Sequence, residues 1–336
     1  MLADTASGLE YLRSCRSLHE QGLFVELAAY DLHVFADIRQ VADTADRRYA
    51  RLADQLGGRG VPSIEEALAE LELEPILEPY RRLVAPDILQ ELVEVQAADA
   101  EGSPPEVAVL DRVEAVLEEL LAAIQARIGG VAEPELAHKI RSDLEELLAG
   151  DRGITLRDLW PPPPAGSPLP PAAVAWVLLR RLADGAPQAL EEGDIGRWLD
   201  DWFLLSNLRR SLLAIGLGAE PSDRAVAAVR ALEACRQWWQ SAPTEPPDLA
   251  ATMRDLLAEP AVASFLGVNR YQGVDWFVSE CWNDLQFCLA VVAAVESDDP
   301  ATLAEVGRRL NLLASARQAS GYRVDELLAA LAAGPE

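Results

Sequence analysis

The chain has 336 residues, half of them hydrophobic, and carries 55 acidic against 29 basic side chains, a formal net charge of −26. Because phosphate binding needs clustered lysine and arginine, this balance argues against nucleic acid as a partner and equally against an anionic membrane surface. Leucine and alanine dominate the apolar residues, so the composition predicts a mainly α-helical globular protein.

The sequence near the N-terminus and the cysteine usage both bear on the compartment. Residues 7–22, SGLEYLRSCRSLHEQG, are charged and lack the apolar core of a signal peptide. No apolar run approaches the roughly 20 residues that a membrane span needs. The four cysteines, Cys15, Cys235, Cys281 and Cys288, are irregularly spaced, which is typical of reduced and mostly buried thiols. These features predict a cytoplasmic protein.

Residues 22–38, GLFVELAAYDLHVFADI, have the period of two that is typical of β-strands. Leu32, Val34, Ala36 and Ile38 share one parity of this pattern. The pattern predicts two strands, one on either side of Ala28–Ala29. Two strands without further partners are only marginally stable in water. Either they complete a sheet whose other strands lie outside this sequence, or the stretch is helical, and we favour the first interpretation. Residues 1–41 are therefore predicted to be a short β element, the end of a β-domain.

From residue 42 to residue 160 the apolar spacing predicts a first helical lobe. A helix over residues 45–56 ends at Gly57–Gly58, and Ser63 with Glu66 forms the capping box of the next helix. Further helices are predicted over residues 88–95, 105–130 and 134–150.

Residues 161–171, PPPPAGSPLPP, are the clearest predicted boundary, since seven prolines in eleven residues favour an extended polyproline II linker. A ligand for a proline-recognition domain is the alternative, which we favour less because no basic residue closely flanks the motif. A second helical lobe is predicted over residues 172–336. Its helices are expected over residues 173–182, 195–213, 222–240, 249–257, 303–316 and 324–331.

Catalytic motifs are not recognisable in this sequence. His19, His33 and His138 lack the spacing of zinc-binding helices, and Cys281 and Cys288 do not form a CxxC pair. Neither a nucleophile elbow nor a phosphate-binding glycine motif occurs. Adjacent carboxylates lie beside leucine stripes, which is typical of a solvated helix face. We therefore predict no catalytic residue, metal site or cofactor in this chain. The arginine pairs are likewise predicted on solvated helix faces: Arg47–Arg48, Arg81–Arg82, Arg180–Arg181, Arg209–Arg210 and Arg308–Arg309.

The turn GVNRYQGVDWF, residues 267–277, is the one candidate binding site. Its amide, guanidinium, carboxylate and aromatic side chains are the groups with which a surface binds sugars, through ring stacking and directed hydrogen bonds. The alternative is that the polar side chains join two helices while the aromatic rings fill the core, which is the commoner role of such rings. The candidate ligand-binding residues are Asn269, Arg270, Tyr271, Asp275 and Trp276.

Several stretches, in the same order and across nearly the whole chain, resemble the C-terminal region of large bacterial α-amylase-family glycoside hydrolases. They are ASGLEYLRS (residues 6–14), GLFVELAAYDLHVFADIRQV (22–41), GGRGVPSIEEALAEL (57–71), EPYRRLV (78–84), FLGVNRYQGVDWF (265–277) and SGYRVDELLAAL (320–331). After residue 277 the chain departs from the family pattern, in which a more acidic and aromatic helix follows. None of these motifs is a catalytic signature.

The resemblance implies a catalytic (β/α)8 barrel and a β-domain, in the same or another chain, that precede this helical region. Residues 22–38 would then resemble the closing strands of the β-domain. The family's catalytic carboxylates lie in the barrel, so no position here corresponds to them. We therefore expect a non-catalytic accessory region of an α-glucan-active enzyme, with contact to α-glucan at residues 267–277. A free-standing helical protein-interaction scaffold is the alternative.

Overall fold

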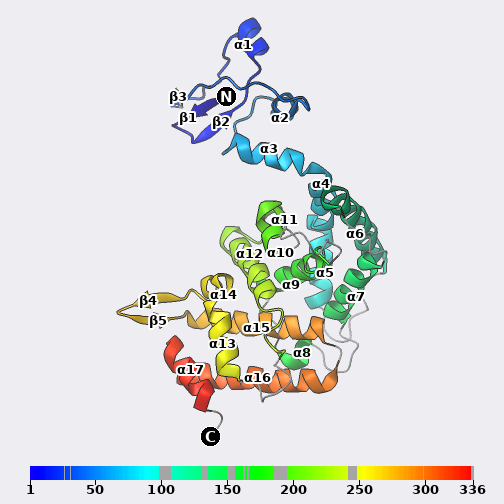
Figure 1. Ribbon diagram of the computed structural model, residues 1–336, viewed down its shortest axis with the longest axis vertical. Coiled ribbons are helices and arrows are strands. Elements are labelled where there is room, and N and C mark those ends of the chain that lie inside the picture. The colour runs from blue at the N-terminus through cyan, green and yellow to red at the C-terminus, as the bar shows by residue number, and fades with distance from the viewer. Residues whose placement is uncertain are drawn as a thin grey trace. The chain divides into compact units, whose positions relative to one another are not determined.

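The computed structural model describes residues 1–25, 27–30, 32–97, 107–129, 135–149, 156–161, 163–164, 166–184, 195–240, 248–297 and 299–333. Their packing divides them into two compact units, Met1–Glu78 and Pro79–Glu336. Helices predominate, and the short strands lie near the N-terminus and in one hairpin (Figure 1). The predicted class, mainly α with a short β element near the N-terminus, is confirmed.

The unit Met1–Glu78 combines a small antiparallel sheet with short helices. The sheet has the order β2-β1-β3, in which Leu2 faces Tyr11 and Ala3 faces Ala36. Val61 exchanges two backbone hydrogen bonds with Glu10 and so covers the outer edge of β2. The elements are β1 (Leu2–Asp4), β2 (Leu9–Tyr11), α1 (Cys15–Gln21), β3 (Phe35–Ala36), α2 (Arg48–Leu56) and α3 (Ile64–Glu72).

The predicted C-terminal end of α2 and the predicted N-terminal start of α3 are confirmed. Gly57 ends α2 with a φ of 54°, a left-handed conformation that glycine adopts without steric cost. The side chain of Ser63 accepts a hydrogen bond from the backbone N–H of Glu66 and so caps α3. The apolar faces of the two helices bury a small core with the segment after β2: Leu12, Leu52, Leu56, Ile64, Leu68 and Leu71.

The strand prediction for residues 22–38 is correct only at Phe35–Ala36. The strand that β3 joins lies within this sequence, at its start, and the described residues of the stretch, 22–25, 27–30 and 32–38, are not helical either. Positive φ angles at Tyr30 (73°) and Asp37 (53°) interrupt the extended backbone on both sides of β3. The alternation of apolar residues therefore does not extend into a ladder of hydrogen bonds.

The unit Pro79–Glu336 consists of helices and one hairpin. Its first helix, α4 (Glu74–Leu83), begins before the division between the units, which falls between Glu78 and Pro79. The remaining elements are α5 (Pro86–Ala97), α6 (Val107–Ile128), α7 (Leu136–Ala149), α8 (Leu156–Leu159), α9 (Leu169–Leu179), α10 (Ile195–Asp201), α11 (Leu204–Ala214), α12 (Ala219–Ala234), α13 (Leu249–Ala258), α14 (Pro260–Phe265), β4 (Asn269–Tyr271), β5 (Val274–Trp276), α15 (Ser279–Glu296), α16 (Pro300–Ala319) and α17 (Val324–Ala333).

Two helices, α9 and α15, form the centre of this unit. Both are apolar on nearly every side, which is the pattern of a helix surrounded by other helices. The first packs against α5, α7 and α12, and the second against α7, α12 and α16. Figure 1 shows α16 running alongside α15, with the β4–β5 hairpin extending away from the helices.

The predicted division into two lobes joined at residues 161–171 differs from the observed packing. Helices of the predicted first lobe, α5 and α7, pack directly against α9 of the predicted second lobe. The last three residues of the predicted linker, Leu169, Pro170 and Pro171, belong to α9 rather than to an extended spacer. Proline fits there because the first N–H groups of a helix have no partner within the helix.

The helix predicted over residues 195–213 is interrupted. Phe203 has a φ of 55° and separates α10 from α11. Trp198 and Trp202, which lie just before this break, stack with ring centroids 4.1 Å apart. The apolar spacing does not mark the break, because the buried residues on its two sides are spaced as in one helix. Trp198 in α10 is followed by Leu205, Leu208 and Leu212 in α11.

Candidate functional site

The predicted binding turn is a tight β-hairpin. Its strands pair Asn269 with Trp276, Arg270 with Asp275 and Tyr271 with Val274. The two residues between the strands, Gln272 and Gly273, have φ angles of 50° and 81°. Positive φ at both positions defines a type I′ turn, whose twist matches that of the flanking strands. The hairpin is therefore locally well determined.

Strand alternation divides the five candidate residues between two faces. Asn269, Tyr271 and Trp276 lie on one face, because cross-strand partners share a face and side chains alternate along each strand. Arg270 and Asp275 lie on the other face, where their charged groups are 3.8 Å apart and exposed. The structure therefore does not bring all five together, and an exposed pair of this kind contributes little to stability.

The base of the hairpin is fixed by close packing. Gly267 has a φ of 63°, and a Cβ atom there would lie 2.8 Å from Cγ2 of Val278, so any other residue would strain the backbone and displace the Val278 side chain. Phe277 is buried and donates its N–H to the carbonyl of Tyr322 at 3.0 Å. Trp276 forms an isolated β-bridge with Arg323, and its indole Nε1 is buried without a hydrogen-bond partner among the described residues. Two stretches of the resemblance, 265–277 and 320–331, thus meet here.

A second feature is an apolar surface on the unit Met1–Glu78, which we call the apolar segment: Leu23, Phe24, Leu27, Tyr30, Leu32, Val34 and Ile38. These seven residues are among twelve exposed large hydrophobics in the described part of the chain, although they come from only sixteen positions. Phe24 is 79% exposed and Tyr30 fully so. So many exposed apolar side chains within one short segment are typical of an interaction site rather than of ordinary protein surface.

Asp4 holds the apolar segment to the sheet. Its carboxylate is buried and accepts hydrogen bonds from the backbone N–H of Val34 at 2.8 Å and from the Ser7 hydroxyl. Nδ1 of His33 lies 2.6 Å from Oδ2 of Asp4, the same oxygen that accepts from Ser7, and it must carry the hydrogen because an ionised carboxylate only accepts. The hydrogen bonds from Ser7 and then from His33 hold the pKa of Asp4 well below its ordinary value of 3.8.

The outer edge of β3 continues the apolar segment. Val34 accepts from the N–H of Thr5, so the backbone groups of Val34 and Ala36 face β1. Backbone groups alternate along an antiparallel strand, and the N–H and C=O of Phe35 therefore face outward. No strand within the described ranges pairs with this edge.

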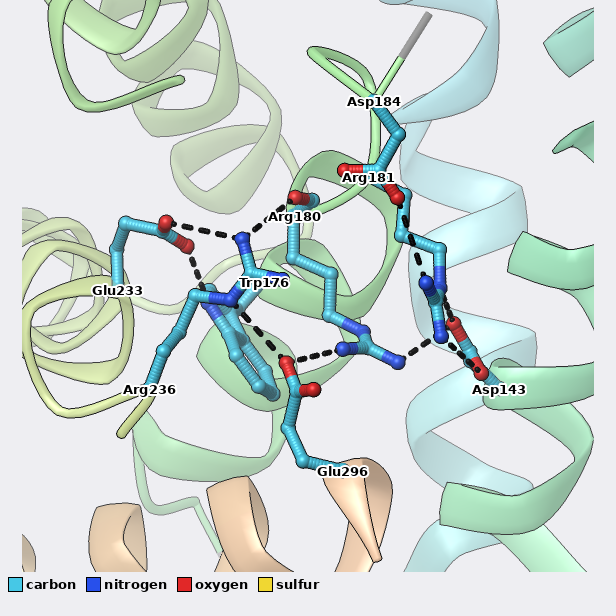
Figure 2. A network of polar contacts seen from close by, with 8 residues as sticks. All are labelled: Asp143, Trp176, Arg180, Arg181, Asp184, Glu233, Arg236 and Glu296. Carbon is cyan, nitrogen blue, oxygen red and sulfur yellow. Dashed lines mark hydrogen bonds and ion pairs between the residues drawn. The ribbon is translucent and has the colours of Figure 1, made fainter. Parts of the chain in front are cut away.

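A buried network of charged residues lies in the unit Pro79–Glu336 (Figure 2). Arg180, at the C-terminal end of α9, has no exposed side-chain surface; it donates to Asp143 of α7 at 2.7 Å and to Glu296 of α15. Arg181 also donates to Asp143, and Arg236 donates to Glu296 at 3.1 Å. The network thereby connects α7, α9 and α15.

The remaining members of this network link it to α12. Glu233 accepts a hydrogen bond from the indole Nε1 of Trp176 at 2.9 Å and lies 3.4 Å from Arg236. Burial raises the pKa of Glu233 above its ordinary value of 4.5, although the charge of Arg236 opposes this shift. Because the charged groups bond mainly to one another, the network is a structural cross-link between helices rather than a site open to a ligand.

The residues that could carry metal or thiol chemistry are separated. His19 and His138 are exposed and His33 is bonded to Asp4, and the described ranges hold no group of three His, Cys, Asp or Glu side chains that could bind a metal ion. The four cysteines are free thiols, of which Cys235 and Cys288 are buried. Burial raises the pKa of Cys235 to about 12 and that of Cys288 well above 9.0, so both remain protonated. Of the helices that the structure describes, none has the length and apolarity to cross a membrane.

Sequence reasoning missed Asp4 and the buried arginines. Arg180 and Arg309 were predicted on solvated helix faces, but both are buried, Arg309 with its guanidinium donating to the carbonyl of Trp239. The one sequence signal for Arg180 is its position at the end of the apolar run of α9. Asp4 lies between Leu2 and the turn that follows, and nothing in its neighbourhood marks it as buried.

Comparison with known proteins gives no further constraint, since the chain matches no protein-family model, no curated protein and no solved structure. The functional argument therefore depends on the two exposed features, the hairpin and the apolar segment.

Proposed function

We propose that this chain is a non-catalytic accessory region of an α-glucan-active, α-amylase-family glycoside hydrolase, which docks and stabilises the catalytic part of that enzyme. The observation that carries the proposal is the apolar segment, because seven large hydrophobic side chains in solvent are a liability for a protein that acts alone.

The geometry of the segment favours a protein surface as the partner. The open edge of β3 presents the backbone groups of Phe35 to a further strand, and the exposed residues Val34 and Ile38 of the apolar segment lie immediately before β3 and shortly after it in the chain. An exposed sheet edge with apolar neighbours is what a neighbouring β-domain covers. The occupant we propose is accordingly the β-domain of the catalytic part, in the same or another chain.

Asp4 supports this interpretation because it orders the part of the segment next to β3 before any partner arrives. A carboxylate that fixes both His33 and Val34 reduces the conformational freedom that docking would otherwise remove. An exposed segment that is already held in one conformation loses less conformational entropy on binding than one that must first be ordered.

The experiment is an immunoblot of the source cells with an antibody against this chain, followed by depletion of the extract with the same antibody. We expect a band several times larger than 36.5 kDa, and we expect depletion to remove α-glucan hydrolysis from the extract in proportion to the protein removed. Pre-immune serum is the control. A band at 36.5 kDa with hydrolysis undiminished after depletion contradicts the proposal.

The second candidate function is a free-standing helical protein-interaction scaffold, which the same apolar segment also favours. It predicts the 36.5 kDa band and a partner that covers the segment without any glucan hydrolysis. Hydrolysis of starch by the isolated chain would contradict both candidates, since neither includes a catalytic residue here.

A further inference from the structure

The strongest further candidate is the hairpin face that carries Asn269, Tyr271, Val274 and Trp276. The isolated bridge between Trp276 and Arg323 places Arg323 on this same face. Among the described residues of the unit Pro79–Glu336, five large hydrophobics are exposed, and three of these belong to the hairpin and its base: Tyr271, Val278 and Tyr322. Exposed aromatic surface in this unit is therefore concentrated at one corner.

We propose that this face of the hairpin is a binding site for a neutral oligosaccharide, in which the ring of Tyr271 stacks on a sugar ring and the amide of Asn269 bonds to sugar hydroxyls. Tyr271 is 63% exposed, and Asn269 is exposed on the same face. The amide Nδ2 of Asn269 donates to the carbonyl of Gly267 at 3.2 Å, so its Oδ1 is the atom that we assign to a sugar hydroxyl. A pyranose presents apolar C–H groups on its faces and hydroxyls at its rim, so it is complementary to a flat ring with amides alongside.

The charges on this face indicate a neutral ligand. The guanidinium of Arg323 is bonded to Asp325 at 3.1 Å and lies 3.4 Å from Glu326. These two carboxylates offset its charge, and the chain as a whole carries −26. A phosphorylated or sulfated ligand would find no uncompensated cation here and would be repelled by the field of the protein.

The size of the face indicates a single extended chain rather than a protein. A stable protein interface covers about 800 Å² on each partner, which comes from some 20 to 30 residues. The hairpin offers four side chains and a narrow ribbon of backbone. Tyr271 and Trp276 are diagonal cross-strand neighbours, roughly 7 Å apart.

The rigidity of the hairpin suits this role. The type I′ turn and the close approach of Gly267 to Val278 fix the strands before any ligand is present. Weak stacking contacts give measurable affinity only when the groups that make them are already ordered. The other face, with Arg270 and Asp275 paired to each other, provides a control on the same hairpin.

The test is affinity electrophoresis of the complete 336-residue chain in native gels that contain amylose, with calorimetric titration of maltoheptaose and cellohexaose. We expect binding of at least one of the two oligosaccharides. Tyr271→Ala should weaken it by about tenfold or more, whereas Arg270→Ala should change it by less than about twofold. Tyr271→Phe keeps the ring and should retain most of the affinity, and Tyr271→Ala should not unfold the protein because the side chain is exposed.

The absence of binding to both oligosaccharides overturns the inference, as does an equal loss of affinity in Tyr271→Ala and Arg270→Ala. The choice between the two sugars bears on the proposed function. Maltoheptaose binding agrees with an α-glucan-active enzyme. Binding of cellohexaose alone supports the proposed oligosaccharide site on the hairpin but argues against that enzyme class. If neither sugar binds and depletion still removes α-glucan hydrolysis, the inference fails and the proposed docking function stands.

Discussion

In the unit Pro79–Glu336 a guanidinium with no exposed surface lies between two carboxylates, whereas in the unit Met1–Glu78 the rings of Phe24 and Tyr30 stand in solvent. The buried charge of Arg180 is compensated within its own unit, by Asp143 and Glu296. The exposed rings have no such complement among the described residues. The comparison teaches that the larger unit supplies the partners of its own buried charge, whereas the smaller unit leaves its apolar segment exposed to solvent.

Arg180→Met removes the buried guanidinium, and we expect it to lower the free energy of unfolding more than the other substitutions in the network. This change leaves Asp143 and Glu296 buried with fewer partners, and loss of one member of a buried ion pair costs about 3 kcal/mol or more. Arg181 and Arg236 remain beside the two carboxylates and should keep the loss near the lower end. The free energy of unfolding in urea, followed by circular dichroism, measures it.

The matched control is Arg308→Met, since Arg308 forms an ion pair with Glu305 on the surface with its side chain 72% exposed. We expect its free energy of unfolding to change by less than about 1 kcal/mol. If the two substitutions have equal effects, the buried network does not stabilise the unit in the way described.

A smaller effect is expected for Glu233, which tests whether the network depends on charge or on hydrogen bonding. Glu233→Gln keeps an acceptor for the Trp176 indole and should change stability at neutral pH by less than about 1 kcal/mol, whereas Glu233→Ala leaves the indole unbonded and should cost about 1–3 kcal/mol. Because burial raises the pKa of Glu233, its stabilising contribution is present at low pH and is lost as pH rises above 4.5. The glutamine variant should lack that loss, which urea titrations at several pH values would detect.

Asp4 should give an effect confined to acid. Its pKa is depressed in the folded protein, so its contribution is present above 3.8 and is lost as the pH falls through and below that value. Asp4→Asn should remove this pH dependence. Hydrogen exchange of the Val34 amide, corrected for the intrinsic rate at each pH, is the measurement. Asp37→Asn, on an exposed pair with Arg39, is the control and should leave the dependence unchanged.

The smallest effect is expected in the apolar segment itself. Phe24→Ser removes an exposed ring and should change the free energy of unfolding by less than about 0.5 kcal/mol. Leu52→Ala, in the core of the same unit, should cost about 2–5 kcal/mol. A substantial loss in Phe24→Ser would mean that this ring packs in solution, and the contrast between the two units would then disappear.

Local signals in the sequence predicted much of the fold. The cap at Ser63, the glycine stop at Gly57 and the long apolar stripes identified most helices because each depends on residues within one or two turns. The three-residue strands β1 and β2 were not predicted, since a period of two is not recognisable over so short a length. The expected strands at residues 22–38 were overextended for the opposite reason: the alternation is present, but the backbone turns at Tyr30 and Asp37.

The candidate site was predicted in part. The sequence located the hairpin by its glycines and aromatics, but it could not assign Arg270 and Asp275 to the opposite face without the register of the strands. The buried network could not be predicted from the sequence, since Arg180 lies 37 residues from Asp143 and 116 residues from Glu296. Sequence neighbours indicated a solvated pair, and only tertiary packing brings the carboxylates to it.

The division between the units also divides the chromophores. All eight tryptophans of the chain lie beyond residue 79, and two of them, Trp198 and Trp202, are stacked closely enough to couple their electronic transitions. The unit Met1–Glu78 contains tyrosines but no tryptophan. Tryptophan emission therefore comes from the larger unit alone, and the smaller unit contributes tyrosine emission.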